Sequence, residues 1–240
     1  MGIKQRQERD REAVRRAILD AARELFVSEG YNNVSMRKIA ERIEYSAASI
    51  YSYFPSKDDI FFELAEEGFR LLSDPAHSRS DLAALAPLDR VRATFWRLYE
   101  FSRDYPQYFA LMFVDRDVPR ITREYERFGF VRDMKARLAG LLQDCIEAEV
   151  IPPGVNPAVG VRVLTMGILG VSVMRLSDRL GATENADDLA RDVLDVLIAG
   201  LQSGVPLRSK GVLVCPQDER QADQQEVMES SASSDVRSVR

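Results

Sequence analysis

The sequence predicts an all-α protein in which a small N-terminal three-helix domain is joined, through a fourth helix, to a larger helical body. Apolar residues recur every three to four positions along most of the chain, which is the spacing of amphipathic helices. Glycine and proline separate these stretches, and no stretch shows the strict alternation of a half-buried strand. The 240 residues are 45% hydrophobic and 30% charged, as in soluble globular proteins.

Cysteine content and charge narrow the class of protein. Cys145 and Cys215 form no disulfide framework or CxxC pair, and the charged N-terminus lacks the apolar core of a secretory signal, so we expect a cytoplasmic protein. The net charge is −5, yet residues 1–57 hold 11 basic against 8 acidic residues. A basic head on an acidic body fits a polyanion partner, although a solvated mixed surface carries the same excess.

Two helices are expected at the start of the chain. Residues 10–29 carry apolar side chains at helical spacing, and Gly30 is suited to end that helix in the left-handed conformation. Ser35 precedes a second apolar run and is a favourable N-cap, because its hydroxyl accepts a hydrogen bond from a free backbone N–H of the first turn. Residues 44–46 are expected to form the turn that leads out of this helix.

A third and a fourth helix follow this turn. Ser46 is expected to cap the third helix, which ends near Pro55 because the residue before a proline disfavours the helical conformation. Ser56 then caps the fourth helix, with Asp58 and Asp59 in its first turn, where the helix dipole favours acidic side chains.

The body is expected as five helical segments that prolines and glycines separate. The predicted segments are residues 88–104, 106–113, 119–149, 158–176 and 186–202. Residues 73–87 are predicted to form a loop with a short helical turn at 81–85. Residues 205–240 are rich in Ser, Gln, Asp and Glu, so we expect a disordered tail there.

Segment 158–176 is apolar on most faces. Arg162 and Arg175 argue against a membrane span, so we expect a helix buried on both sides. Gly167 and Gly170 would permit close approach of a neighbouring helix. Together with residues 186–202, this segment is expected to form half of a four-helix homodimer interface.

The segment from Ser35 to Lys57 has the spacing of a helix-turn-helix. Ile50 and Phe54 lie four residues apart and supply the packing face of the second helix. Small residues at positions 47–49 would let the start of that helix approach the edges of DNA bases. Lys57 lies at the start of the fourth helix, where an ammonium group and free backbone N–H groups can meet a phosphate together.

With these residues identified, the segment 14–64 resembles the DNA-binding domain of TetR/AcrR-type transcriptional regulators. The matching residues are Ile18, Ala21, Ala22, Leu25, Phe26, Gly30, Tyr31, Ser35, Ile39, Ala40, Ser46, Ile50, Tyr51, Tyr53, Phe54 and Lys57. The rest of the chain resembles the family only in helical pattern and length. The resemblance implies a homodimer with a DNA-binding helix-turn-helix domain at 1–56 and a helical ligand-binding and dimerisation domain at 57–204.

Three positions depart from the family pattern. Glu44 stands where the family usually has glycine in the turn, Ala48 where glycine is common, and Ser49 where threonine is common. Glu44 is the largest change, because it places an acidic side chain near the expected DNA side.

The resemblance implies that nine residues face DNA: Ser35, Arg37, Ala47, Ala48, Ser49, Tyr51, Ser52, Tyr53 and Lys57. We assign Tyr51, Tyr53 and Lys57 mainly to phosphates. The tyrosines, taken singly, also fit plain helix packing, and Lys57 also fits a solvated charge.

Base recognition is expected to depend on few side chains. The recognition helix has no Arg, Lys, Asn or Gln, which are the usual readers of base edges. We therefore predict that Arg37 reads a guanine and that Ala47 or Ala48 touches a thymine methyl group. A simple ion pair between Arg37 and Glu41, four residues later, is the alternative.

Aromatic and methionine side chains crowd the middle of the chain, and core packing explains most of them. The resemblance implies that some line an inducer pocket, for which the candidates are Phe95, Tyr99, Phe109, Met112, Met134 and Met166. Ligand binding would move the fourth helix and change the spacing of two DNA-binding heads.

No catalytic or metal-binding pattern is visible. His77 is the single histidine and lies in a predicted loop, and Cys145 has no evident base partner. We expect no enzymatic activity, no cofactor and no metal. The favoured hypothesis is a homodimeric regulator of a palindromic operator in double-stranded DNA, a repressor released by a small apolar or amphipathic ligand. The alternative is a helical ligand-binding or interaction module that no longer binds DNA.

Overall fold

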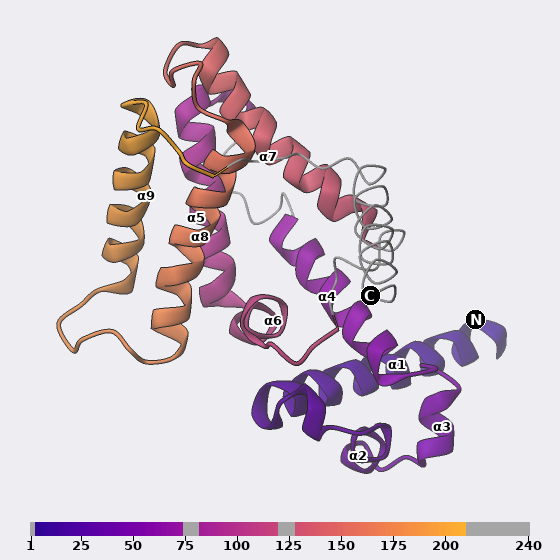
Figure 1. The fold of residues 1–240 in the computed structure, drawn as a ribbon. Coiled ribbons are helices and arrows are strands. Elements are labelled where there is room, and N and C mark those ends of the chain that lie inside the picture. The colour runs from indigo at the N-terminus through magenta and orange to yellow at the C-terminus, as the bar shows by residue number, and fades with distance from the viewer. Residues whose placement is uncertain (1–2, 74–81, 120–127, 210–240) are drawn as a thin grey trace, which may run out of the picture.

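In a computed structural model, residues 3–73, 82–119 and 128–209 are described, and within them every regular element is a helix. Helices α1, α2 and α3 form a head at one end of the molecule, and α5, α8 and α9 run side by side at the other (Figure 1). Helix α4 connects the two parts. The all-α fold class is confirmed.

The head begins with a helix that is longer than predicted. Helix α1 spans Ile3–Glu29, so it starts seven residues before the predicted residue 10. Residues 5–13 are exposed, which is why they carry no apolar periodicity. Lys, Gln, Arg and Glu are strong helix formers, and this propensity extends α1 beyond the part that packs.

The predicted caps of the head are confirmed, whereas α3 ends at Tyr51 rather than near Pro55. Gly30 has φ 83° and ends α1, and η1 (Tyr31–Asn33) follows. Ser35 accepts a hydrogen bond from the backbone N–H of Lys38 and caps α2 (Met36–Arg42). Ser46 accepts from the N–H of Ser49 at 3.1 Å and caps α3 (Ala47–Tyr51).

Helix α4 (Lys57–Ser73) carries apolar residues that reach both parts of the molecule. Ser56 caps it, since its hydroxyl oxygen accepts from the N–H of Asp59 at 3.2 Å. Ile60 and Leu64 are fully buried in the head core, whereas Phe69 packs on Phe113, with ring centroids 6.5 Å apart. One apolar core therefore continues from the head into α4, across the domain boundary that the sequence predicts between residues 56 and 57.

The body starts with the short turn η3 (Leu82–Ala84) and α5 (Pro87–Asp104). The predicted segment 106–113 is instead α6 (Pro106–Phe109) followed by a π-helical turn, η4 (Ala110–Val114). In this turn the N–H of Asp115 donates to the carbonyl of Ala110, five residues earlier, at 2.9 Å. Helix α7 (Gly129–Glu147) occupies the second half of the predicted segment 119–149.

The last two helices are α8 (Pro157–Leu176) and α9 (Ala186–Gln202), close to their predicted bounds. Within the described residues, α8 is the one helix long and apolar enough to cross a membrane. It packs against α5, α7 and α9, which accounts for its apolar composition. A Cβ atom on Gly167 would collide with Leu197, so this glycine permits the close approach of α9, whereas Gly170 faces open space.

Some expectations fall outside the described residues. These are the loop at 74–81, which includes His77, the segment 120–127, and the tail from residue 210 onward. In addition, within the described residues no cluster of His, Cys, Asp and Glu is suited to hold a metal ion.

Substitution of Glu44 by glycine is expected to stabilise the head. Glu44 adopts φ 61°, a left-handed conformation that costs a residue with a Cβ atom about 1–2 kcal/mol. Glycine avoids this cost, but its greater conformational freedom in the unfolded state offsets part of the gain. We expect Glu44→Gly to raise the free energy of unfolding in urea by about 0.5–1 kcal/mol. Glu44→Ala keeps the Cβ atom and should show no such gain; an equal gain in both variants would indicate a charge effect and contradict this reason.

Candidate nucleic-acid interface

Helix α3 is fixed on the head by two buried side chains. Ile50 is 0% exposed and Phe54 is 2% exposed, and both belong to the core that also holds Ile39 and Ala40 of α2. Arg15 of α1 covers the outer side of Phe54, with its guanidinium carbon 4.8 Å from the ring centroid. The opposite face of α3 is therefore held outward.

The predicted DNA-facing residues divide into two groups by exposure. Ser35, Arg37, Ala48, Tyr51 and Ser52 are exposed, and Ala47, Ser49, Tyr53 and Lys57 are half-buried. Tyr51 is 55% exposed, which does not fit a packing role for this ring. The exposed residues present a surface of small side chains beside one tyrosine, at the end of the head remote from the body (Figure 1).

Arg37 extends from α2 into solvent. Its side chain is 81% exposed, and its Nε donates to Glu41 at 2.8 Å, so the predicted alternative of an ion pair is present. The hydrogen bond to Glu41 raises the pKa of Arg37 further above its ordinary value. An exposed pair of this kind is weak, so a phosphate or a base can replace Glu41 as the partner of Arg37.

Lys57 folds back onto the head. Its ammonium group donates to the carbonyl of Tyr31 at 2.8 Å and lies 4.0 Å from the centroid of the Tyr31 ring. Burial raises the pKa of Tyr31 above its usual range, and the hydrogen bond from its hydroxyl to Asp58 adds to this. A phosphate contact would require Lys57 to leave the tyrosine.

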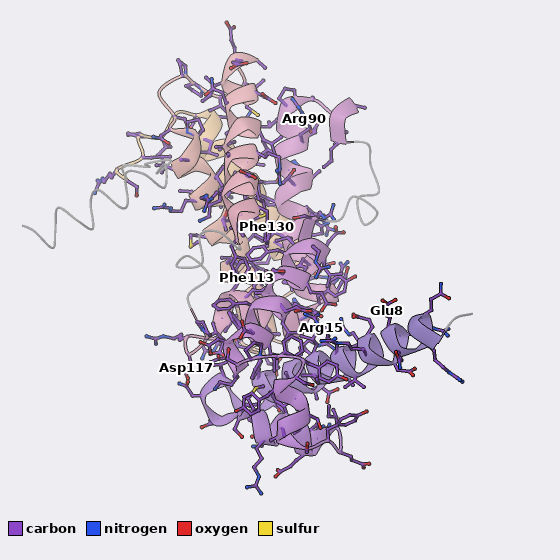
Figure 2. All side chains as sticks on the ribbon, turned by 90° about the vertical axis from the view of Figure 1, so that its right-hand side faces the viewer. Glu8, Arg15, Arg90, Phe113, Asp117 and Phe130 are labelled. Atoms are coloured by element: carbon purple, nitrogen blue, oxygen red, sulfur yellow. The ribbon has the colours of Figure 1, made fainter. Side chains whose placement is uncertain are left out.

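The start of α1 adds basic residues to this end of the molecule. Arg11 lies over the ring of Tyr53 at 5.8 Å, and Arg15 pairs with Glu63 of α4. Figure 2 shows Glu8 on the part of α1 that extends away from the body, with Arg15 nearer to it. The sequence prediction missed this contact because it considered only the apolar spacing of this helix and not its charged side chains.

A polar network joins the head to the body. Arg16 of α1 pairs with Glu67 of α4 at 2.6 Å, and Arg23 donates to the hydroxyl of Tyr108 on α6 at 2.9 Å. Asp20 bonds Arg16, which lowers the pKa of its carboxyl group. Burial raises the pKa of Tyr108, so its hydroxyl stays protonated and neutral. Side-chain hydrogen bonds therefore join α1 directly to α6 and to α4.

Five of the six predicted ligand-pocket residues lie in or beside two separate cores. Phe95 and Tyr99 pack with α8 and α9, whereas Phe109 is fully buried near α1 and α4, with Met112 and Met134 at the edge of that core. Figure 2 shows Phe113 and Phe130 in the middle of the molecule, where each packs against Phe69. This second group forms an aromatic and methionine cluster where α4, η4 and α7 meet.

Met166 departs from the pocket prediction. It is 56% exposed and lies on the outward face of α8, because residues 161, 164, 168 and 171 take the inward face. This face also carries Gly170 and Met174, and Val196 of the neighbouring α9 is 69% exposed. We call the surface of Met166, Gly170, Met174 and Val196 the outer face.

Comparisons with known proteins agree with this geometry. Residues 18–64 match the model of the bacterial regulatory proteins of the tetR family, and this stretch holds α2, α3 and their caps. This stretch therefore has the sequence of a tetR-type DNA-binding region. The HTH-type transcriptional repressor Rv1474c of Mycobacterium tuberculosis is 42% identical over 55 residues, which are 23% of this chain and 29% of that repressor. The curated relatives are thus matched over less than half of their length.

Solved structures extend the likeness beyond residues 18–64 to more than three quarters of this chain. The regulator FadR from Bacillus subtilis, solved with stearoyl-CoA, has a TM-score of 0.62 at 18% identity and covers 77% of this chain and 97% of its own. AibR, solved with isovaleryl coenzyme A and operator DNA, has a TM-score of 0.58 at 20% identity and covers 78% of this chain and 97% of its own. At these identities the likeness concerns the fold alone.

Removal of the Tyr108 hydroxyl is expected to loosen the contact between α1 and α6. Tyr108→Phe keeps the ring under Arg23 but removes the hydrogen-bond acceptor, so we expect a loss of about 1 kcal/mol in the free energy of unfolding. Urea unfolding measures this loss. Tyr45→Phe, at a 45% exposed position, is the control and should change nothing; equal losses in both variants would contradict a role for the network.

Proposed function

We propose that the protein is a homodimeric transcriptional regulator that binds a palindromic operator through α3 and represses transcription until a ligand releases it. The observation that carries this proposal is the outward face of α3, which combines small residues and an exposed tyrosine on a helix anchored by Ile50 and Phe54. Small side chains permit close approach to the major groove, and the adjacent tyrosines and Lys57 are suited to phosphates.

The proposed releasing ligand is small and apolar or amphipathic, and its place is the helical body. The aromatic and methionine cluster supports this, because methionine side chains adapt to bound groups of varied shape. Neighbouring folds were solved with acyl-CoA ligands, and one of them also with operator DNA. Curated relatives are regulators rather than enzymes, and we assign a cytoplasmic location and no catalysis to this chain.

Operator binding is the direct test. A duplex selected from a random pool is titrated in a fluorescence anisotropy assay at two salt concentrations. We expect specific binding whose affinity falls steeply with salt, since each neutralised phosphate contributes a slope of roughly −0.9 in the logarithm. If selection enriches no duplex, the alternative of an interaction module without DNA binding is correct.

Arg37→Ala then tests base recognition. We expect a loss of about 1–3 kcal/mol that is largest for one base pair, because a bidentate contact to guanine would be removed. Arg42→Ala is the matched control, since Arg42 lies on the same helix and pairs with Glu24 at 3.0 Å. An equal loss on every operator variant would show that Arg37 contacts only the backbone.

The outer face is proposed as the homodimer interface. Val196→Glu would place a charge at the centre of an apolar contact, so we expect the variant to sediment as a monomer in analytical ultracentrifugation. Ala136→Glu introduces the same charge at an exposed site on α7 and should leave the dimer intact. Dimers of unchanged stability in the Val196 variant would place the interface elsewhere.

A further inference from the structure

A buried polar cluster lies at the C-terminal ends of α5 and α8. Ser102 of α5 and Ser172 of α8 are both 0% exposed, and both belong to helices that otherwise present apolar side chains to each other. Arg175, three residues after Ser172 and therefore on the same side of α8, donates from Nη2 to the carbonyl of Ser102 at 2.5 Å. We call Ser102, Ser172 and Arg175 the polar cluster.

Two hydrogen-bond donors of the polar cluster are unsatisfied. The Ser172 hydroxyl and the Arg175 Nε are both inaccessible to solvent and have no hydrogen-bond partner. Arg175 satisfies one free carbonyl at the end of α5 with Nη2, so capping accounts for that nitrogen but not for Nε or for Ser172. Buried polar groups are almost always paired, and exceptions of this kind point to a bound group.

The charge of Arg175 is not matched by an acidic side chain in the described part of the chain. The acidic residues at this end of α5 and α9 have other partners, because Asp104 and Asp187 both pair with Arg103. Asp187 also accepts from the hydroxyl of Tyr99 at 2.7 Å. One guanidinium group is therefore left to balance one negative charge.

Apolar side chains surround the polar cluster on the side of the aromatic and methionine cluster. Phe101, which precedes Ser102, belongs to the same core as Phe109, and Val173 and Leu176 of α8 pack against that core. Met112 and the π-helical turn η4 line another part of it. Turns of this kind are frequent at functional sites, so two independent features mark this region.

We propose that the polar cluster binds the carboxylate of an amphipathic acid whose apolar chain lies among the side chains of the core that holds Phe101 and Phe109. The guanidinium Nε and the Ser172 hydroxyl would each donate one hydrogen bond to the carboxylate, and a hydrogen bond between a charged donor and a carboxylate is a strong one. A carboxylate, with a single negative charge, fits better than a phosphate, because the Arg175 guanidinium is the one cation here without an acidic partner among the described residues. This inference rests on the proposed ligand-responsive function and names the class of ligand.

The test compares two probes that differ only in charge, decanoate and 1-decanol. Isothermal titration of the full chain is expected to show decanoate binding roughly tenfold or more tighter than decanol, since hydrogen bonds to charged groups are the strong ones. Arg175→Gln is expected to lower decanoate affinity by about tenfold and to leave decanol affinity within about threefold. Arg162→Gln, on the exposed face of the same helix, is the control and should change neither affinity.

Ser172→Ala keeps the test decisive if loss of the α5 cap unfolds the Arg175 variant. It removes a hydroxyl that bonds nothing within the protein, so it should leave stability unchanged and weaken decanoate binding about three- to tenfold. Equal affinities for both probes, no binding of either, or unchanged decanoate binding in the Ser172 and Arg175 variants would overturn the proposal. Binding of decanoyl-CoA, a thioester without the carboxylate, in place of decanoate would also overturn it.

Failure of this inference is distinguishable from failure of the proposed function. Operator binding by the ligand-free protein requires neither probe, so a chain that binds its operator and ignores decanoate is still a regulator. A chain that binds decanoate through Arg175 but selects no operator would instead be the helical binding module.

Discussion

The position of α4 is the constraint on which the rest of the structure depends. Its first turns are buried in the head through Ile60 and Leu64, and its last turns pack through Phe69 against the aromatic cluster of the body. Because a buried helix cannot bend without opening cavities, the two ends move as one unit. The network from Arg16 to Glu67 ties α1 to the same helix. The same helix thus packs against both the head core and the body core.

In this arrangement, the side chains that anchor α3 differ from those that are proposed to contact DNA. Ile50 and Phe54 face inward and hold α3, and the outward side chains are mostly too small to make strong base-specific hydrogen bonds. Arg37, one helix earlier, is the long exposed donor on the same end of the head. Part of the operator specificity is then expected from DNA shape, read through phosphate contacts.

Local signals in the sequence predicted the head well. Ser35 and Ser46 are N-caps because each hydroxyl accepts a hydrogen bond from a free backbone N–H in the first turn of the helix that follows. Gly30 ends a helix because glycine tolerates a positive φ. Features that depend on tertiary contacts could not be predicted from the sequence. The turn Ala110–Val114 is π-helical, and Met166 faces outward because α8 is covered on its other sides.

The distance between the two heads in the operator complex is the most direct measure of how rigidly α4 holds them. Spin labels on Ser52→Cys would report it by double electron–electron resonance, with Cys215 replaced by serine and Cys145 protected by burial, which also raises the pKa of its thiol. Rigid packing of α4 predicts one narrow distance near a whole turn of DNA, about 34–36 Å, or a multiple of it. A broad distribution that operator DNA leaves unchanged would show that α4 does not hold the heads rigidly.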